Sequence, residues 1–265
     1  MRVDIDHTTT YRFDSPVGGA LQEVRLTPRD SPAQRVERWE IHVEGGRTEV
    51  DFRDHHANRV TLISIDSGVE RATVRCRGTV ETDDTGGVTA PSGLAPRWLY
   101  ERQTELTTAG HNVRALLAGF DDPVDDPIER MHALSAHIRS TIAYDPGWTH
   151  VATTAEDAIE AERGVCQDHT HVFLAAAREL GVPARYVSGY LVVTDEPDQP
   201  ATHAWAEAWI DDLGWLGLDV SNVISPDDRY VRLAVGLDYR EAAPVSGIRF
   251  GDGNEHLDVA VQIQQ

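Results

Sequence analysis

Apolar and polar side chains alternate with a period of two over much of the first 82 residues, which predicts β-strands. In the clearest case, Trp39, Ile41 and Val43 fall on one face of the expected strand. Glycine-rich turns separate these runs, and short strands with such links favour a β-sandwich. The predicted strands of this region cover residues 8–13, 36–43, 60–65 and 71–80.

Residues 82–96 are rich in Asp, Gly and Pro and predict a linker. We expect it to separate a β-rich domain, residues 1–85, from a second domain, residues 86–265. In the second domain helical patterns come first and strands follow, which predicts an α+β fold with a long helix packed on an antiparallel sheet. Its predicted strands cover residues 184–193, 204–210, 215–219, 231–235 and 257–263.

Two helices are expected before residue 166. Asp126 supplies a capping acid and Pro127 a first-turn proline for the first of them. A shorter helix is predicted from Thr154 to Gly164. The expected buried stripe of the first helix contains Ile128, Met131, Leu134 and Ile138.

A third helix begins near Cys166, where apolar positions recur at helical spacing until Gly181 and Pro183 end it. Gly164 precedes this helix, so Cys166 falls in its first turn, beside backbone N–H groups that have no partner within the helix. Such a position favours the thiolate, which is the nucleophilic form of cysteine. Most lone cysteines are buried and structural, so the helix start alone leaves both interpretations open.

His203 begins a later strand and Asp219 ends the strand that follows it. A nucleophilic thiolate needs a base, and that base needs an acid to fix its tautomer, so this order of residues predicts nucleophilic catalysis. A plain two-residue turn would point His203 and Asp219 to opposite faces of the sheet. The two can meet only if residues 211–215 contain a bulge or a shifted loop. Without such a shift, Asn222 is the alternative to Asp219 as the residue that orients His203.

The segments GVCQDHTHVFLAAARELGVPARYVSGY, HAWAEAWIDDLGWLGLDVSN and LAVGLDYREAAPVSGIRFGDGNEHLDVAVQI resemble the bacterial and archaeal transglutaminase-like family of papain-type cysteine enzymes. HTTTYRF and VRLTPRDSPAQRV resemble, more weakly, the β-rich domain that precedes the core in this family. The resemblance implies an N-terminal β-sandwich, a papain-like core, and a catalytic triad of Cys166, His203 and Asp219. Relatives usually carry an aromatic and then a small residue where this chain has His169 and Thr170.

Further residues are candidates for the surroundings of the site. Asp168 is expected to support the helix start or to line the cleft, and Trp205 shares strand parity with His203. Glu207 has that parity too, but a strand glutamate usually lies on a solvated face. The backbone N–H of the nucleophile is the natural first oxyanion donor. The resemblance offers Tyr144 as the second donor, with packing at a helix end as an open alternative.

Metal binding is a rival interpretation of the crowded residues around the nucleophile. The nearby cysteine spacing matches no common zinc motif, and no calcium-binding loop is recognisable, so we expect no metal and no cofactor. The residues that this alternative would use are Cys166, Asp168, His169 and His171.

The formal net charge is −20, and arginine supplies all 24 basic residues. Such a surface repels nucleic acid and anionic membranes, so neither is an expected partner. The acid excess favours a halophilic host, in which salt screens the repulsion between carboxylates. A GC-rich genome would explain the missing lysine but not the excess of acids.

The chain contains no signal-like apolar segment at Met1 and no run near the ~18 apolar residues of a membrane span. Cys76 lies in a strand-like run and is expected to fill the core. These features predict a cytoplasmic protein with one free reactive thiol, at Cys166.

The expected activity is cleavage of amide or peptide bonds through a thioester, with a peptide or protein as substrate. Two alternatives stay open. One is transfer of a glutamine acyl group to an amine, as in a true transglutaminase, and the other is a binding module that kept the fold without catalysis. Hydrolysis is favoured over transfer because no segment suggests a lid that would keep water from the thioester.

Overall fold

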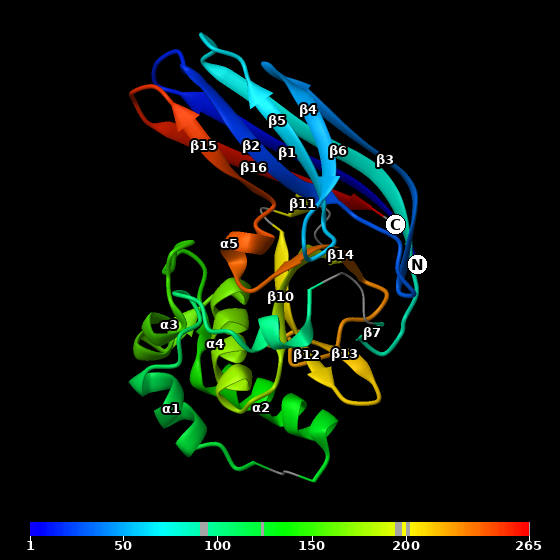
Figure 1. Cartoon of the computed structure of the whole chain (residues 1–265), viewed down its shortest axis with the longest axis vertical. Coiled ribbons are helices and arrows are strands. Elements are labelled where there is room, and N and C mark those ends of the chain that lie inside the picture. Colours follow the sequence, from blue (N-terminus) through cyan, green and yellow to red (C-terminus); the bar gives the residue numbers. More distant parts are fainter. Residues whose placement is uncertain (91–94, 123–124, 194–197, 200–201, 265) are drawn as a thin grey trace.

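The computed structural model describes residues 1–90, 95–122, 125–193, 198–199 and 202–264. A β-sandwich occupies one end of the molecule and an α+β region the other, and the two chain termini lie close together on the sandwich (Figure 1). Within the described residues, no helix is both long enough and apolar enough to cross a membrane.

The sandwich consists of two antiparallel sheets built from both ends of the chain. Its strands are β1 (Arg2–Phe13), β2 (Gly19–Thr27), β3 (Gln34–Glu44), β4 (Gly46–Arg53), β5 (Arg59–Ile65), β6 (Arg71–Thr82), β11 (Asp198–Gln199), β15 (Val245–Phe250) and β16 (Glu255–Gln264). One sheet has the order β11-β16-β1-β6-β3, and the other has the order β15-β2-β5-β4. The predicted sandwich is confirmed, although β2 and β4 were not expected from the pattern.

The two C-terminal strands differ from the expected division of the chain. The pattern places residues 245–264 with the second domain, but β15 pairs with β2 and β16 pairs with β1. In the second pairing Ile5 lies opposite Ile263, and both side chains are buried in the sandwich. Alternation along a strand reveals which face is buried but not which sheet the strand joins, so the sequence could not assign this pairing. The boundary near residue 85 stays a prediction.

The α+β region contains an antiparallel sheet of its own, with strand order β14-β10-β12-β13-β7, and the helices that cover it. Its strands are β7 (Val88–Thr89), β10 (Ala184–Leu191), β12 (His203–Ile210), β13 (Gly214–Leu218) and β14 (Tyr230–Gly236). Its helices are η1 (Arg97–Glu101), α1 (His111–Ala118), α2 (Pro127–Thr141), α3 (Ala155–Ala161), α4 (Cys166–Glu179) and α5 (Tyr239–Ala242). The predicted linker therefore contributes an edge strand, β7, to this sheet.

Helix α4 packs on β12, as the α+β expectation requires (Figure 1). Ala204, Ala206 and Ala208 of β12 lie in the same buried cluster as the alanines of α4, and small side chains let a helix approach a sheet closely. Because side chains alternate along a strand, the odd-numbered residues of β12 point to the opposite face.

Helix α2 begins as the sequence predicts, with the Asp126 carboxylate accepting from the N–H groups of Ile128 and Glu129. Its buried residues include Met131, Leu134 and Ile138. Ile128 was expected in the same stripe, but its side chain is 37% exposed. It lies in the first turn of the helix, where the helix has only begun to cross the core.

The two regions share apolar packing. Tyr190 of β10 and Val192, which follows that strand, lie in the sandwich core together with Val231 and Leu233 of β14. These two strands therefore extend from the α+β sheet into the sandwich. Such shared packing holds the start of β12 close to the joint between the two regions.

Candidate active site

Cys166 is the first residue of α4 and is partly exposed. The chain reaches it through β9 (Arg163–Gly164), which pairs in parallel with β8 (Ala143–Tyr144). The Asp168 carboxylate accepts from the Val165 N–H at 2.8 Å, which closes the first turn of the helix. A Cβ on Gly164 would lie 2.6 Å from the Asp168 Cβ, so glycine is needed at that position. Asp168 thus supports the helix start.

Asp168 also ties the helix start to the loop before α3. Its Oδ2 accepts from the Thr149 hydroxyl at 2.7 Å, and the residue is almost fully buried. Burial raises the pKa of Asp168, although its bonds from Val165 and Thr149 favour the ionised form. The carboxylate therefore acts on the position of the nucleophile and does not open onto the cleft.

His203 and Asp219 meet directly. The Asp219 Oδ2 accepts from the His203 Nε2 at 2.6 Å. Nε2 is thereby occupied, and the other ring nitrogen, Nδ1, remains to face the thiol. Cys166 is the other neighbour that acts on the imidazole, since hydrogen bonding to its side chain and its charge both raise the pKa of His203. The acid, the imidazole and the sulfur thus form one interacting series.

The hairpin register explains how the two side chains share a face. Ile210 pairs with Gly214, and Ala206 pairs with Leu218. The connection between the strands contains residues 211–213, with Asp212 in the left-handed region at φ 66°. This shifts the pairing by one position from that of a plain two-residue turn, so Asp219 falls in line with the odd-numbered face of β12. The expected shift within residues 211–215 is confirmed.

Asp219 is fully buried, and its Oδ2 also accepts from the Tyr230 hydroxyl and from the Asn222 side-chain amide, each at 2.7 Å. Burial raises its pKa, but these bonds and the charge of His203 together hold it below the usual value. The carboxylate is therefore ionised and directed at the imidazole. Tyr230 lies eleven residues further along the chain, and no local pattern in the sequence indicated its part in the site.

The imidazole of His203 is held in its charged form. Burial lowers its pKa, but the hydrogen bonds to Asp219 and Cys166 and the negative charges of both groups outweigh burial and raise it to about 10. At neutral pH the proton therefore resides on the ring. A protonated imidazole beside a sulfur atom is the arrangement that stabilises a thiolate.

Trp205 and Tyr230 form the wall behind His203. The Trp205 ring centroid lies 6.4 Å from that of His203, and the Tyr230 ring meets Trp205 edge-on at 5.4 Å. Trp205 is buried, so it orients the imidazole by packing and offers little surface to a ligand.

Tyr144 lies beside the nucleophile through the pairing of β8, in which it stands opposite Gly164. Its side chain is 46% exposed. Burial and the charges of Cys166 and Asp219 raise its pKa, so its hydroxyl keeps its proton and can donate a hydrogen bond near the thiol. Its role as an oxyanion donor stays a prediction.

The side chains of His169 and His171, which follow the nucleophile on α4, form hydrogen bonds with other parts of the chain. His169 Nδ1 is bonded to the Ser221 hydroxyl at 2.9 Å and Nε2 to the Ile142 carbonyl at 3.2 Å. Burial lowers the pKa of His169 to about 4 and that of His171 to about 3, so both rings are neutral. His171 accepts from the Tyr239 N–H at 3.2 Å. His169 thus connects α4 to the turn that follows Asp219.

Glu207 contradicts the expectation of a solvated face. It is 1% exposed, and its carboxylate is paired with Arg185 at 2.5 Å and with Arg232 at 3.0 Å. The expectation failed because a strand pattern shows which residues share a face but not that arginines from β10 and β14 converge on that face.

Two parts of the chain match known families. Residues 3–81 match the Bacterial transglutaminase-like N-terminal region, and residues 114–220 match the Transglutaminase-like superfamily. The second match includes Cys166, His203 and Asp219.

Two similar proteins match almost the whole chain, and a third matches about one third of it. The uncharacterized protein ML0607 of Mycobacterium leprae is 31% identical over 99% of this chain and 98% of its own length. Rv2569c of Mycobacterium tuberculosis, also uncharacterized, is 28% identical over 99% of this chain and 92% of its own length. A protein-glutamine gamma-glutamyltransferase of Pseudomonas aeruginosa is 28% identical over 34% of this chain and 15% of its own length.

The similarity to a solved structure extends over the whole chain. A candidate cysteine protease from Cytophaga hutchinsonii superposes with a TM-score of 0.79 over 100% of this chain and 90% of that chain, at 19% identity. At this identity the likeness establishes the shared fold, a papain-like core behind a β-rich N-terminal region.

Proposed function

Because this chain belongs to the transglutaminase-like superfamily, we propose that it is a cysteine enzyme that cleaves amide or peptide bonds through a thioester. The observation that carries the proposal is the position of His203, which is bonded to Asp219 at 2.6 Å and whose pKa is raised by the neighbouring thiol of Cys166 as well. A non-catalytic binding module has no need for a charged imidazole between a buried carboxylate and a partly exposed thiol.

In the first half of the reaction the Cys166 thiolate attacks the carbonyl carbon of the amide. His203 then donates its proton to the leaving amine, and a thioester to Cys166 remains. In the second half the neutral imidazole takes a proton from the water that attacks the thioester. The acid product then leaves, and the Cys166 thiolate and the protonated ring of His203 are restored. Asp219 holds the ring in the tautomer that both steps need.

The oxyanion of each tetrahedral intermediate needs donors close to the sulfur. The Cys166 backbone N–H is the first, since it belongs to the first turn of α4 and has no partner within that helix. The Tyr144 hydroxyl is the second, because it is protonated and its strand pairs with Gly164, two residues before the nucleophile. Tyr144→Phe, which keeps the ring, is expected to lower kcat more than it changes KM.

Hydrolysis is the favoured outcome over amine transfer. Trp148 and Val151, in the loop beside the helix start, are 54% and 60% exposed, so water reaches this side of the site. Transfer to an amine requires a site that keeps water from the thioester. The similarity to a protein-glutamine gamma-glutamyltransferase keeps transfer as the second candidate. A peptide or protein is the proposed substrate in both cases.

Two measurements test the proposal. Alkylation by iodoacetamide at pH 6, followed by mass spectrometry, is expected to modify the parent chain at Cys166 and to leave Cys166→Ala unmodified. A glutamine-containing peptide with an excess of primary amine is then expected to give mainly free acid or cleaved peptide. Mainly amine adduct would assign the protein as a transglutaminase, and an unreactive Cys166 would reject the nucleophile.

A further inference from the structure

A second cluster of chemically versatile side chains lies at the joint between the sandwich and the α+β region, outside the candidate active site. It consists of His55, His56 and Glu241, and one ligand-type atom from each lies within 4.8 Å of the others. Within the part of the chain that the structure describes, this is the one group of three or more His, Cys, Asp or Glu residues that meets this spacing.

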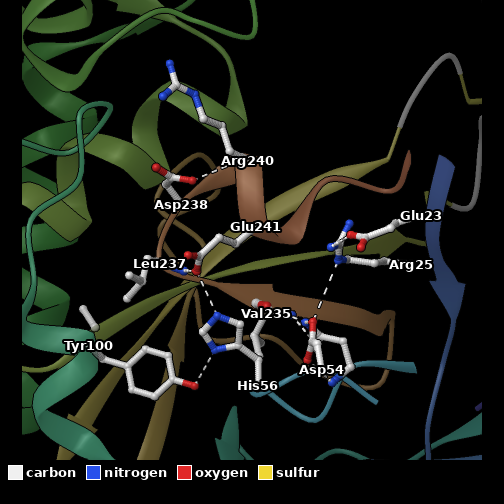
Figure 2. Close-up of polar contacts among 12 residues, drawn as sticks. Glu23, Arg25, Asp54, His56, Tyr100, Val235, Leu237, Asp238, Arg240 and Glu241 are labelled. Carbon is white, nitrogen blue, oxygen red and sulfur yellow. Dashed lines mark hydrogen bonds and ion pairs between the residues drawn. The ribbon is translucent and has the colours of Figure 1, made fainter. Parts of the chain in front are cut away.

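The cluster joins segments that are distant in sequence. His55 and His56 lie in the turn between β4 and β5 of the sandwich, and Glu241 lies in α5, which follows β14 of the other region. Figure 2 shows the turn reaching α5, with His56 directed at Glu241 on one side and at Tyr100 of η1 on the other.

The turn is held rigidly in this position. Asp54 accepts from the Asn58 N–H at 2.8 Å, and Ala57 has a left-handed φ of 64°. The Asn58 side chain bonds to both the N–H and the carbonyl of Val235 in β14, at 2.8 and 2.7 Å. A ligand would therefore meet an arrangement that is already formed, which lowers the entropic cost of binding.

His56 has the environment of a metal-binding histidine. It is 1% exposed, and its Nδ1 lies 2.8 Å from the Tyr100 hydroxyl, while Nε2 lies 2.8 Å from the Glu241 carboxylate (Figure 2). Histidine ligands commonly use one ring nitrogen for the ion and donate the other N–H to an outer partner, which fixes the ring. Tyr100 is placed to be that partner.

Glu241 and His55 complete the set. The Glu241 carboxylate accepts from the Leu237 N–H at 2.8 Å, which orients it. The same carboxylate oxygen lies 2.8 Å from the His56 Nε2, so it already faces the ring that would share the ion. The ring centroids of His55 and His56 lie 3.9 Å apart. The His55 side chain is exposed, so an ion can reach the cluster from solvent.

We propose that His55, His56 and Glu241 bind a Zn²⁺ ion that links the sandwich to the α+β region. Two imidazoles and one carboxylate form a donor set that zinc accepts, and the fourth position would hold water on the exposed side of His55. Calcium and magnesium prefer sites made of oxygen ligands and do not fit two imidazoles.

Binding requires the Nε2 lone pair of His56 to face the ion. The ring would then donate its Nδ1–H to the Tyr100 oxygen, which lies 2.8 Å away, and the ion would take the place of the direct contact between Nε2 and Glu241.

Zinc titration of the full-length chain by calorimetry tests the site, in a Cys166→Ala background so that the active-site thiol does not bind the metal. We expect one Zn²⁺ per chain and a melting temperature that rises with added zinc. His55→Ala removes a ligand without opening the core, and we expect it to weaken binding by about tenfold or more and to abolish the thermal shift. Glu241→Gln, which keeps an acceptor for Leu237, should weaken binding similarly.

His42→Ala serves as the matched control, because His42 is a 71% exposed histidine of the same sandwich, 3.9 Å from Glu44. We expect zinc affinity to be unchanged in this variant, and Ca²⁺ or Mg²⁺ to leave zinc binding unchanged. Equal zinc affinity in His55→Ala and its parent would overturn the site. A parent chain that binds no zinc would overturn it too and would show that His56 and Glu241 form only a hydrogen-bonded link.

Discussion

Strand β12 carries two chargeable side chains on one face, the partly buried His203 at its start and the buried Glu207 four residues later. Glu207 is surrounded, since Arg185 and Arg232 together pair with both of its carboxylate oxygens. His203 is bonded to Asp219 on one side, but on the other side it meets a thiol that is partly open to solvent.

This difference separates a structural cluster from a reactive one. Both oxygens of Glu207 have a cationic partner within the fold, so this carboxylate is occupied by the two arginines and acts on stability. The chain Asp219–His203–Cys166 ends at an atom that an incoming carbonyl can reach. Both the Glu207 cluster and the candidate active site contain groups with shifted pKa values, and only the active site is open to solvent.

The largest expected effect is on the reactivity of Cys166. His203→Ala removes the positive charge beside the sulfur, and we expect the rate of alkylation by iodoacetamide at pH 6 to fall by about 10²-fold or more. Cys76 is the internal control, because burial raises the pKa of its thiol to about 12 and it should stay unmodified in both proteins. Equal rates at Cys166 in both proteins would remove His203 from the mechanism.

The variant Glu207→Gln tests whether the cluster around Glu207 acts on stability. It leaves Arg185 and Arg232 buried without their anion, and we expect the free energy of unfolding to fall by about 3–5 kcal/mol in urea denaturation. Alkylation of Cys166 in the folded protein should change little. Glu105→Gln, at an exposed ion pair with Arg240, should stay near the parent stability. A large loss of Cys166 reactivity in folded Glu207→Gln would show that the two clusters act as one.

The pH dependence of His203 provides a third test. Its pKa is raised from 6.5 to about 10, so the charged ring stabilises the fold fully below about pH 6.5, and this contribution is lost as pH rises through about 10. Turnover that needs the charged ring as acid should decline over the same upper range. NMR titration should find the ring still protonated at pH 8, with a lower pKa in Asp219→Asn. Titration of the parent ring near 6.5 would contradict this account.

The smallest expected effect is that of salt on thermal stability. Salt acts on the charges of the surface and not on the Glu207 cluster or the candidate active site. Raising salt from 0.1 to 1 M shortens the screening length from ~10 to ~3 Å, which weakens the repulsion among the excess carboxylates of this −20 chain. We expect the melting temperature in calorimetry to rise by about 2–4 °C for each kcal/mol gained. A flat or falling curve would favour genome composition over halophily as the origin of the acidic, lysine-free sequence.

Much of the site was predictable because its parts depend on local signals. The periodicity after Cys166 predicted α4, and the parity of His203 and Asp219 showed in advance that residues 211–215 had to shift the register. Tyr230 and the environment of Glu207 were not predictable in this way. Both depend on contacts between strands that are not neighbours along the chain, and strand patterns carry no information about such partners.

The amino-acid sequence by itself determined the order and type of the main elements and the placement of a cysteine at a helix start, because periodicity, caps and turn residues act over a few positions. Only the tertiary structure decided that β15 and β16 return to the sandwich and that His56 meets Glu241. These contacts form between distant segments, and their free energy comes from burial and hydrogen bonding that exist only once the chain has folded.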